Sequence, residues 1–593
     1  MSVAVAAAAA GLTWRRLFFG MDLQDEGFSI LVPWRWVLGH APYSEVKDVF
    51  QIPALLEYPF LKLFGLVRGN DPTGLVLYTR HLYLLLMVGV AVVVFLLLRR
   101  LVRWELALLV ASLCVTFIPW ATPQLSYNTM ALAFLTLSAA LGASVVVVGG
   151  RRRLAVASGA ALGLAVVAYP SLLFITPFWA VLLAFAHGTR TTTLLATGRL
   201  GHDAQRFAPE TGRSAWRTVS GWTLGGLLVL VPVGLLSLSY GPHVLAASVR
   251  STMEGAKASH QLGGAAKAIA VVGGYERLIA WRPSLLVGAL VIYLVYRRWP
   301  LVGRALLLTT PVALWLAAQR PELWASGYVI IFAFLAPWLF LFVPAARRRP
   351  GAQLLVCVWA PSMIAGAMTA YTSAAGYVSS AVGFAPSVFV SGLFLAWALE
   401  ALRDPGVPGA ESARGGTRRP WPALVGLVAL VAVTLAFQYQ FQERNVPYGE
   451  LTRRMTSGPW WGIAVTPSRA ALMTSIQTDV AREARKGDSL LIEYQAPGLY
   501  LSWNGPIAST TYWLSPGPDE ALPAGTVAFY RKTDSVPSLV VRLTSTAGQD
   551  ETALAQDTGG LDYPPVVVRP WYFLARKPAG DGTQEVLARL PQP

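Results

Sequence analysis

Residues 82–98 have the sequence LYLLLMVGVAVVVFLLL, in which no side chain is charged. Residues 328–346 and 423–437 are apolar runs of the same kind. Because an α-helix rises 1.5 Å per residue, runs of this kind are about long enough to cross a hydrocarbon layer of ~30 Å. The sequence therefore predicts a polytopic α-helical membrane protein.

The composition agrees with this fold class. Of the 593 residues, 54% are hydrophobic and 13% are charged, whereas a soluble domain usually carries about 25% charged residues. The net charge of +17 would suit a nucleic-acid-binding protein, but the basic residues form short clusters between apolar runs, which is typical of topology determinants. We therefore exclude nucleic acid as a partner. Cys114 and Cys357 lie inside apolar runs and predict no disulfide or metal–thiolate site.

The apolar windows and their polar breaks predict about thirteen transmembrane helices. Their approximate positions are 2–19, 76–98, 105–121, 128–149, 154–169, 171–187, 221–239, 279–296, 304–318, 325–345, 352–371, 381–399 and 421–438. Basic clusters such as Arg151–Arg153 and Arg347–Arg349 then fall on one side, which their positive charge marks as cytoplasmic. We predict that three segments lie on the opposite, extracytoplasmic side: residues 20–74, residues 240–279 and the chain after about residue 441. We expect the protein to lie in the cell (plasma) membrane.

Residues 441–593 have the composition of a soluble protein, unlike residues 1–440, which contain the predicted spans. Helical periodicity over 468–486 is followed by strand-like runs at 489–494, 526–530, 539–543, 566–569 and 571–575. We predict a transmembrane domain at 1–440 and a small extracytoplasmic α/β domain at 441–593. The second domain contains no pattern of a nucleophile elbow, a metal cluster or a phosphate-binding loop.

The first extracytoplasmic segment, 20–74, is rich in Pro, Trp and acidic residues, and residues 21–50 read MDLQDEGFSILVPWRWVLGHAPYSEVKDVF. Asp25 and Glu26 come a few residues after the first predicted span. Asp22 precedes them by three and four positions, so one helical turn would gather the three carboxylates. Because acidic groups partly buried beside a membrane are costly, they usually mark a functional site. Two solvated loop acids would be the ordinary alternative.

The sequence context favours a site. DEGF (25–28) is followed by LGHAPYSEVKDVF (38–50), then by an apolar run with prolines that ends in LFG (63–65), and then by Arg80. This order resembles the first extracytoplasmic loop of GT-C glycosyltransferases that use polyprenyl-phosphate sugars, in particular the bacterial branch related to protein mannosyltransferases and lipid A aminoarabinose transferases. The motif covers roughly residues 1–85. The chain departs from the usual pattern in its short first span and in Ser44–Val46, which leaves the role of Asp48 open.

The resemblance implies a GT-C-like fold and an inverting sugar transfer to an extracytoplasmic acceptor. It implies that Asp25 is the general base and that Glu26 orients it or exchanges roles with it. His40, Tyr43 and Asp48 belong to the same motif and are implied to contact substrate.

The chemistry suits these residue types. A sugar on a polyprenyl phosphate has a good leaving group, so the reaction needs a base for the acceptor hydroxyl and cations for the departing phosphate. The candidate phosphate ligands are three arginines at the outer ends of predicted spans: Arg80, Arg282 and Arg320. The alternative for each is an interfacial arginine whose guanidinium extends into the aqueous phase. Tyr127 and Asn128, at the turn between the third and fourth spans, are candidate sugar contacts or simple interfacial caps. Adjacent acidic residues are compatible with a divalent metal ion, but no cofactor is defined by the sequence.

The leading hypothesis is therefore a membrane glycosyltransferase with a polyprenyl-phosphate sugar as donor, a cell-envelope glycan, lipid or protein as acceptor, and the lipid bilayer as its environment. A transporter or flippase for a lipid-linked saccharide would have similar hydropathy. A non-catalytic scaffold of the cell envelope, with a degenerate first loop, is the third hypothesis.

Overall fold

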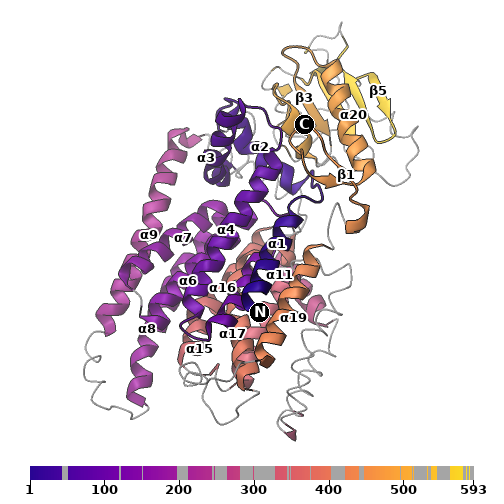
Figure 1. Ribbon diagram of the computed structural model, residues 1–593. Helices are drawn as coiled ribbons and strands as arrows, with labels where there is room; N and C mark the ends of the chain where they lie inside the picture. Colours follow the sequence, from indigo (N-terminus) through magenta and orange to yellow (C-terminus); the bar gives the residue numbers. More distant parts are fainter. Residues whose placement is uncertain are drawn as a thin grey trace.

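The computed structural model describes most of the chain. The described residues are 1–42, 51–118, 122–149, 151–196, 211–243, 264–280, 327–343, 349–373, 375–401, 421–439, 446–493, 496–509, 536–543 and 563–578, with a few isolated positions between them. Figure 1 shows two parts, a bundle of long helices and a smaller part with strands at one end of it.

Most of the helices belong to the bundle. They are α1 (Ser2–Arg16), α4 (Leu75–Leu98), α5 (Trp104–Thr116), α6 (Tyr127–Val148), α7 (Arg152–Ala168), η2 (Pro170–Ile175), α8 (Thr176–Ala196), α9 (Thr211–Ser239), α11 (Gly264–Ala280), α14 (Gly327–Phe342), α15 (Arg349–Leu354), η3 (Leu355–Trp359), α16 (Ala360–Thr372), η4 (Gly376–Ser379), α17 (Ser380–Ala401) and α19 (Trp421–Gln438).

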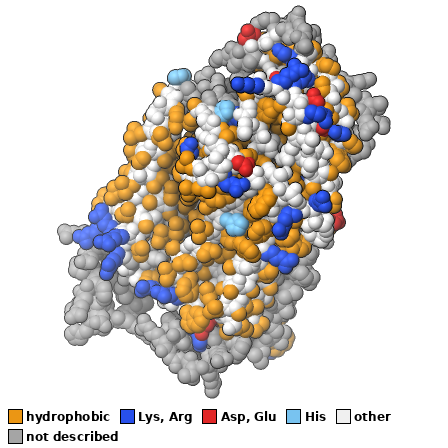
Figure 2. Space-filling view, turned by 45° about the horizontal axis from the view of Figure 1, so that its top comes forward, with side chains coloured by type: hydrophobic (Ala, Val, Ile, Leu, Met, Phe, Trp, Pro, Cys, Tyr) orange, Lys and Arg blue, Asp and Glu red, His pale blue; other side chains and the backbone are white. Residues whose placement is uncertain are grey.

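Six apolar segments in the described part of the chain are long enough to cross a membrane. They are Leu75–Leu98, Tyr127–Val148, Pro170–His187, Ala215–Ser239, Pro350–Thr372 and Gly376–Glu400. The last of these is buried inside the bundle along its whole apolar window, whereas Leu85 of α4 and Leu228 and Leu235 of α9 expose their side chains. Figure 2 shows a broad band of hydrophobic side chains across the visible face of the bundle. The chain is thus a polytopic helical membrane protein, as predicted, and the count of thirteen spans stays a prediction.

Helices α7 and α9 lie side by side in Figure 1 and meet through glycines. A Cβ atom on Gly159 would lie 1.7 Å from the carbonyl oxygen of Trp222, and one on Gly225 would lie 1.9 Å from that of Val156. The spacing of Gly159 and Gly163 is the small-xxx-small pattern that lets helix backbones approach closely in membranes.

We expect Gly159→Val to destabilise the bundle by about 1–3 kcal/mol, because the new side chain would push α9 away from α7. The measurement is thermal unfolding of the detergent-solubilised protein. Gly234→Val in α9 is the matched control, since a Cβ there meets no atom within 4 Å. Equal melting temperatures for the two variants would contradict this account of the contact.

Two further helices, α2 (Asp25–Val37) and α3 (Gln51–Arg68), lie between α1 and α4 in the chain. Each contains a proline, Pro33 and Pro59. The inner face of α2 is fully buried, with Trp34 at 0% exposure, and Gly65 of α3 lies against Trp34 and Val37. Helix α2 therefore belongs to the interior of the protein and is not a surface loop.

The part with strands contains η5 (Tyr448–Glu450), β1 (Arg453–Arg454), β2 (Ala464–Val465), α20 (Pro467–Glu483), β3 (Leu490–Glu493), η6 (Pro497–Ser502), β4 (Leu539–Leu543), β5 (Pro565–Arg569) and β6 (Tyr572–Arg576). Among the described residues, four strands form a sheet in the order β3-β4-β6-β5, with β3 and β4 parallel and the other pairs antiparallel. The predicted helix and the predicted strands at 489–494, 539–543, 566–569 and 571–575 are present. Most of the predicted strand at 526–530 lies outside the described residues.

One carboxylate joins α20 to the sheet. Asp479 of α20 accepts hydrogen bonds from Arg569 Nε at 2.9 Å, from Arg569 Nη2 at 3.1 Å and from the Tyr572 hydroxyl at 2.6 Å. One hydrophobic core also runs from this part into α2 and α3, because Trp34 and Leu61 share it with Trp460 and Tyr500. The boundary between two domains at residue 440 stays a prediction.

Candidate active site

The acidic dipeptide Asp25–Glu26 begins α2, and Glu26 is held by an arginine of α4. Arg80 Nε donates to Glu26 Oε1 at 2.7 Å, and Arg80 Nη2 donates to Glu26 Oε2 at 2.7 Å. Both side chains are buried, with exposures of 0% for Glu26 and 1% for Arg80. This is a two-point ion pair, the geometry in which a guanidinium fixes a carboxylate most firmly.

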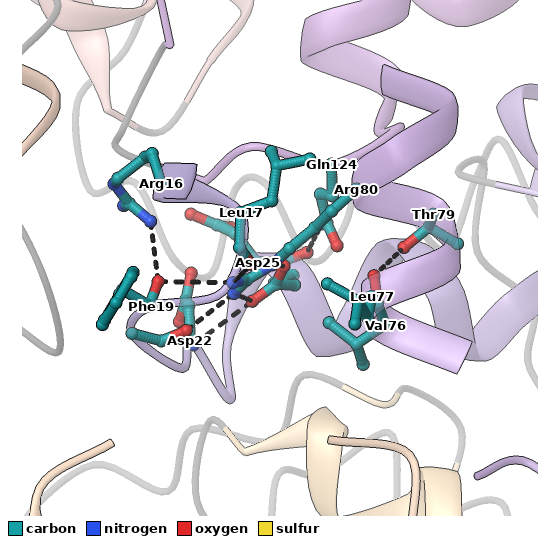
Figure 3. Close-up of polar contacts among 12 residues, drawn as sticks. Arg16, Leu17, Phe19, Asp22, Asp25, Val76, Leu77, Thr79, Arg80 and Gln124 are labelled. Atoms are coloured by element: carbon teal, nitrogen blue, oxygen red, sulfur yellow. Dashed lines mark hydrogen bonds and ion pairs between the residues drawn. The ribbon is translucent and has the colours of Figure 1, made fainter. Parts of the chain in front are cut away.

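Arg80 also holds the backbone that leads into the acidic dipeptide, as Figure 3 shows. Its Nη1 donates to the carbonyl oxygen of Leu17 at 2.5 Å, and its Nη2 donates to that of Gly20 at 2.7 Å. Arg16 Nη1 donates to the carbonyl oxygen of Phe19 at 2.7 Å. The sequence suggested that Arg80 binds a donor phosphate. In the structure its guanidinium is already surrounded by Glu26 and these carbonyls, so Arg80 fixes the loop.

Asp25 presents the opposite situation. It is the first residue of α2, its side chain is half-buried, and no residue that the structure describes donates a hydrogen bond to its carboxylate. Only its main-chain carbonyl is bound, by the Ser29 hydroxyl at 3.0 Å and by Gln124 Nε2 at 3.4 Å. Burial, followed by the nearby charge of Asp22, raises the pKa of Asp25 to about 7. The Asp25 carboxylate is therefore partly exposed, has no donor among the described residues, and has a pKa close to neutral.

Asp22 completes the acidic group. Its main-chain N–H donates to Glu26 Oε2 at 3.4 Å, and its Oδ1 accepts a hydrogen bond from the main-chain N–H of Gln24 at 2.9 Å. The three carboxylates are gathered, as the spacing predicted, but a turn before α2 brings Asp22 in, and α2 begins only at Asp25.

Gln124, which the sequence reasoning missed, lies beside Asp25 in the turn before α6 (Figure 3). Its side chain is 0% exposed, and its Oε1 has no hydrogen-bond partner among the described residues. The turn itself is fixed, because Thr129 Oγ1 donates to the carbonyl oxygen of Gln124 at 2.6 Å and Ser126 caps α6. A buried polar atom without a partner is costly unless a ligand or a water molecule satisfies it.

The other predicted residues divide into two groups. Tyr127 and Asn128 form the first turn of α6, three and four residues after Gln124, and are half-buried. His40 lies beyond the far end of α2, on the order of 20 Å along the helix from Asp25 at 1.5 Å per residue, so it is not part of the same cluster. Four predicted residues lie outside the described residues: Tyr43, Asp48, Arg282 and Arg320.

No metal centre is evident in the described ranges. Within them, no group of three or more His, Cys, Asp or Glu side chains is placed to hold a metal ion.

A solved structure shares this architecture over the whole chain. The crystal structure of ArnT from Cupriavidus metallidurans in the apo state covers 100% of this chain and 99% of its own length, with a TM-score of 0.50 and 14% sequence identity. The chain has the GT-C fold. The predicted resemblance is thereby confirmed at the level of the fold.

A second solved structure is more distant. The archaeal oligosaccharyltransferase AglB from Archaeoglobus fulgidus, in complex with an inhibitory peptide and a dolichol-phosphate, covers 91% of this chain and 69% of its own, with a TM-score of 0.48 and 13% identity. No protein-family model and no curated protein sequence matches the chain.

Removal of the Asp22 charge tests whether this charge raises the pKa of Asp25. Carbodiimides modify protonated carboxyl groups, so labelling of Asp25 followed by peptide mass spectrometry should fall with a midpoint near pH 7. Asp22→Asn removes a like charge and should move this midpoint down by about one pH unit. Glu450→Gln, which removes an exposed carboxylate, should leave it in place. An unchanged midpoint in Asp22→Asn would show that the two carboxylates do not interact.

Proposed function

We propose that this protein is a membrane glycosyltransferase that moves a sugar from a polyprenyl-phosphate donor to an extracytoplasmic acceptor of the cell envelope, with Asp25 as the general base. The observation that carries the proposal is the Asp25 carboxylate, half-buried, without a described hydrogen-bond donor, and with a pKa raised to about 7. The GT-C fold supports the same assignment.

The reaction needs one base. In the proposed step, the Asp25 carboxylate takes the proton of the acceptor hydroxyl while that oxygen forms a bond to the anomeric carbon of the sugar. The bond between this carbon and the phosphate oxygen breaks, and the polyprenyl phosphate leaves with the bonding electrons. Attack opposite the leaving group inverts the anomeric centre. A base whose pKa is near the working pH is best suited to this proton transfer.

The remaining residues of the cluster have distinct proposed roles. Glu26 and Arg80 are positioning residues that hold the loop under Asp25. Gln124, Tyr127 and Asn128 are proposed to contact the sugar or the acceptor. The departing phosphate requires cations, and Arg282 and Arg320 remain the proposed phosphate ligands, with His40, Tyr43 and Asp48 as proposed substrate contacts elsewhere in the loop. No step of this proposal needs a metal ion.

The proposed orientation places the active site and residues 441–593 on the extracytoplasmic side of the plasma membrane. The basic clusters between the apolar runs support this orientation.

The test uses the purified protein in nanodiscs. Synthetic undecaprenyl-phosphate-linked hexoses and pentoses are supplied one at a time, with cell-envelope extract from the native host as acceptor. We expect one donor to be consumed, with release of undecaprenyl phosphate, only when the extract is present. Movement of an intact donor across liposomes without cleavage would favour the flippase hypothesis. Consumption of no donor, with the protein folded, would favour a scaffold.

A further inference from the structure

The stretch of chain that leads into the acidic dipeptide is attached at two points to the part of the chain after residue 446. Before the dipeptide, the main-chain N–H of Ala464 in β2 donates to the carbonyl oxygen of Phe18 at 2.7 Å, and the main-chain N–H of Gly20 donates to the carbonyl oxygen of Ala464 at 2.8 Å. Next to it, the main-chain N–H of Gly498 in η6 donates to the carbonyl oxygen of Leu23 at 2.8 Å. Asp25 thus lies close to two anchoring points.

A contact between two glycines brings the backbone of α2 directly onto η6. A Cβ atom on Gly27, two residues after Asp25, would lie 2.2 Å from the main-chain nitrogen of Gly498 and 2.3 Å from its Cα atom. A Cβ atom on Gly498 would lie 3.0 Å from the Trp460 ring and 3.1 Å from the backbone of Leu23. No other residue type fits at Gly27 without a shift of one backbone against the other.

The far end of α2 is attached to the same part of the chain. Arg35, which is 1% exposed, donates from Nη1 to the carbonyl oxygen of Trp503 at 3.0 Å and from Nη2 to that of Gly505 at 2.9 Å. Hydrogen bonds from a buried charged group are among the stronger polar contacts in a protein. Helix α2 is therefore held at its first turn and at its last turn by residues more than 450 positions away in the sequence.

From these contacts we infer that the part of the chain after residue 446 positions the catalytic carboxylate, and that Gly27, Gly498 and Arg35 are positioning residues of the transferase. This inference rests on the proposed function. General bases must lie within hydrogen-bond reach of the proton that they take, and a displacement of about 1 Å can cost on the order of 10²-fold in rate. Contacts that set the position of α2 against η6 therefore set the position of Asp25.

A graded pair of substitutions tests the inference. Gly498→Ala requires a displacement of a few tenths of an ångström at Leu23, whereas Gly27→Ala requires a much larger one at Gly498. With saturating donor, chosen as the undecaprenyl-phosphate sugar that the wild-type protein consumes, we expect kcat to fall by about 10²-fold in Gly27→Ala and by roughly tenfold in Gly498→Ala. The donor KM should change by less than about threefold, because the inference gives these glycines the role of positioning the base and not of binding the donor.

The second readout does not depend on turnover. If α2 moves away from η6, water reaches Asp25, and the burial that raises its pKa weakens. The pH midpoint for carbodiimide labelling of Asp25 should then fall in both variants, more in Gly27→Ala. Gly449→Ala in η5 is the matched control, because a Cβ there meets no atom within 4 Å, and it should leave kcat and the midpoint unchanged. General destabilisation would lower the amount of active protein without moving the midpoint.

The outcomes separate this inference from the proposed function. If both glycine variants stay folded with unchanged kcat and an unchanged midpoint, the inference is overturned, whatever Asp25 does. If the midpoint moves in the glycine variants but Asp25→Asn keeps full turnover, the positional coupling holds and the catalytic role of Asp25 is wrong.

Discussion

Asp25→Asn is expected to lower sugar transfer by about 10³-fold while the protein stays folded. The amide has nearly the shape of the acid but cannot take a proton from the acceptor hydroxyl, and loss of a general base typically costs 10²–10⁴-fold in rate. The measurement is release of undecaprenyl phosphate from the donor that the wild-type protein consumes. Glu450→Gln, at an exposed carboxylate in η5, is the control and should retain full activity.

The same substitution should stabilise the protein, which separates a chemical effect from misfolding. The pKa of Asp25 is raised from its ordinary value of 3.8 to about 7 in the folded state. Between these values the folded state binds more protons than the unfolded state, so the free energy of unfolding falls as the pH rises from 4 to 7. Asp25→Asn has no carboxyl group to ionise at this position, so its free energy of unfolding does not fall for this reason as the pH rises. The melting temperature of Asp25→Asn relative to wild type should thus be nearly equal at pH 4 and higher at pH 8, by a few degrees.

Two results would count against the assignment. Full transfer activity in Asp25→Asn would remove the enzyme hypothesis in its present form. If the melting temperature of Asp25→Asn is lower than that of wild type by the same amount at pH 4 and at pH 8, Asp25 is a structural residue. The loss of activity in the variant then reflects misfolding.

The sequence predicted the polytopic helical membrane fold, because long apolar runs depend only on local composition. It also predicted α20 and the strands β3 to β6 within a few residues, since their periodicity is local. It did not predict α2 and α3 as separate helices, because the Pro-, Trp- and acid-rich composition of residues 20–74 favoured a loop; α2 contains Pro33 and α3 contains Pro59. A proline inside a helix removes one hydrogen bond and crowds the preceding turn, and burial of the Trp34 face of α2 outweighs this cost.

The sequence identified the acidic dipeptide but did not assign its partners. Arg80 and Glu26 are 54 positions apart, and nothing near either residue indicates that they pair. An arginine at the outer end of a span looks the same in sequence whether it meets a phosphate or a carboxylate. The contact between Gly27 and Gly498 is also invisible, because each glycine alone is ordinary turn or helix material and only their meeting gives them a role.

Arg80→Met is expected to have the largest effect on stability of any single substitution at this site, a loss of about 3–5 kcal/mol. It leaves the Glu26 carboxylate, which is 0% exposed, without its cation. It also leaves the carbonyl oxygens of Leu17 and Gly20 without the donor that Arg80 supplies. Glu26→Gln should cost less, about 1–3 kcal/mol, because the amide oxygen still accepts from Arg80 and the carbonyl contacts of Arg80 remain.

The double variant decides whether the pair acts as one unit. When both charges are gone, neither is left buried and unpaired, so Glu26→Gln combined with Arg80→Met should lose less stability than the sum of the two single losses, with a coupling of about 1–3 kcal/mol. Chemical denaturation in detergent at neutral pH measures all three variants against wild type. Additive losses would mean that Arg80 acts through the backbone carbonyls alone and that Glu26 is free to serve as the base. A coupled loss keeps Glu26 tied to the fold, and Asp25 is then the carboxylate of the dipeptide that is available for chemistry.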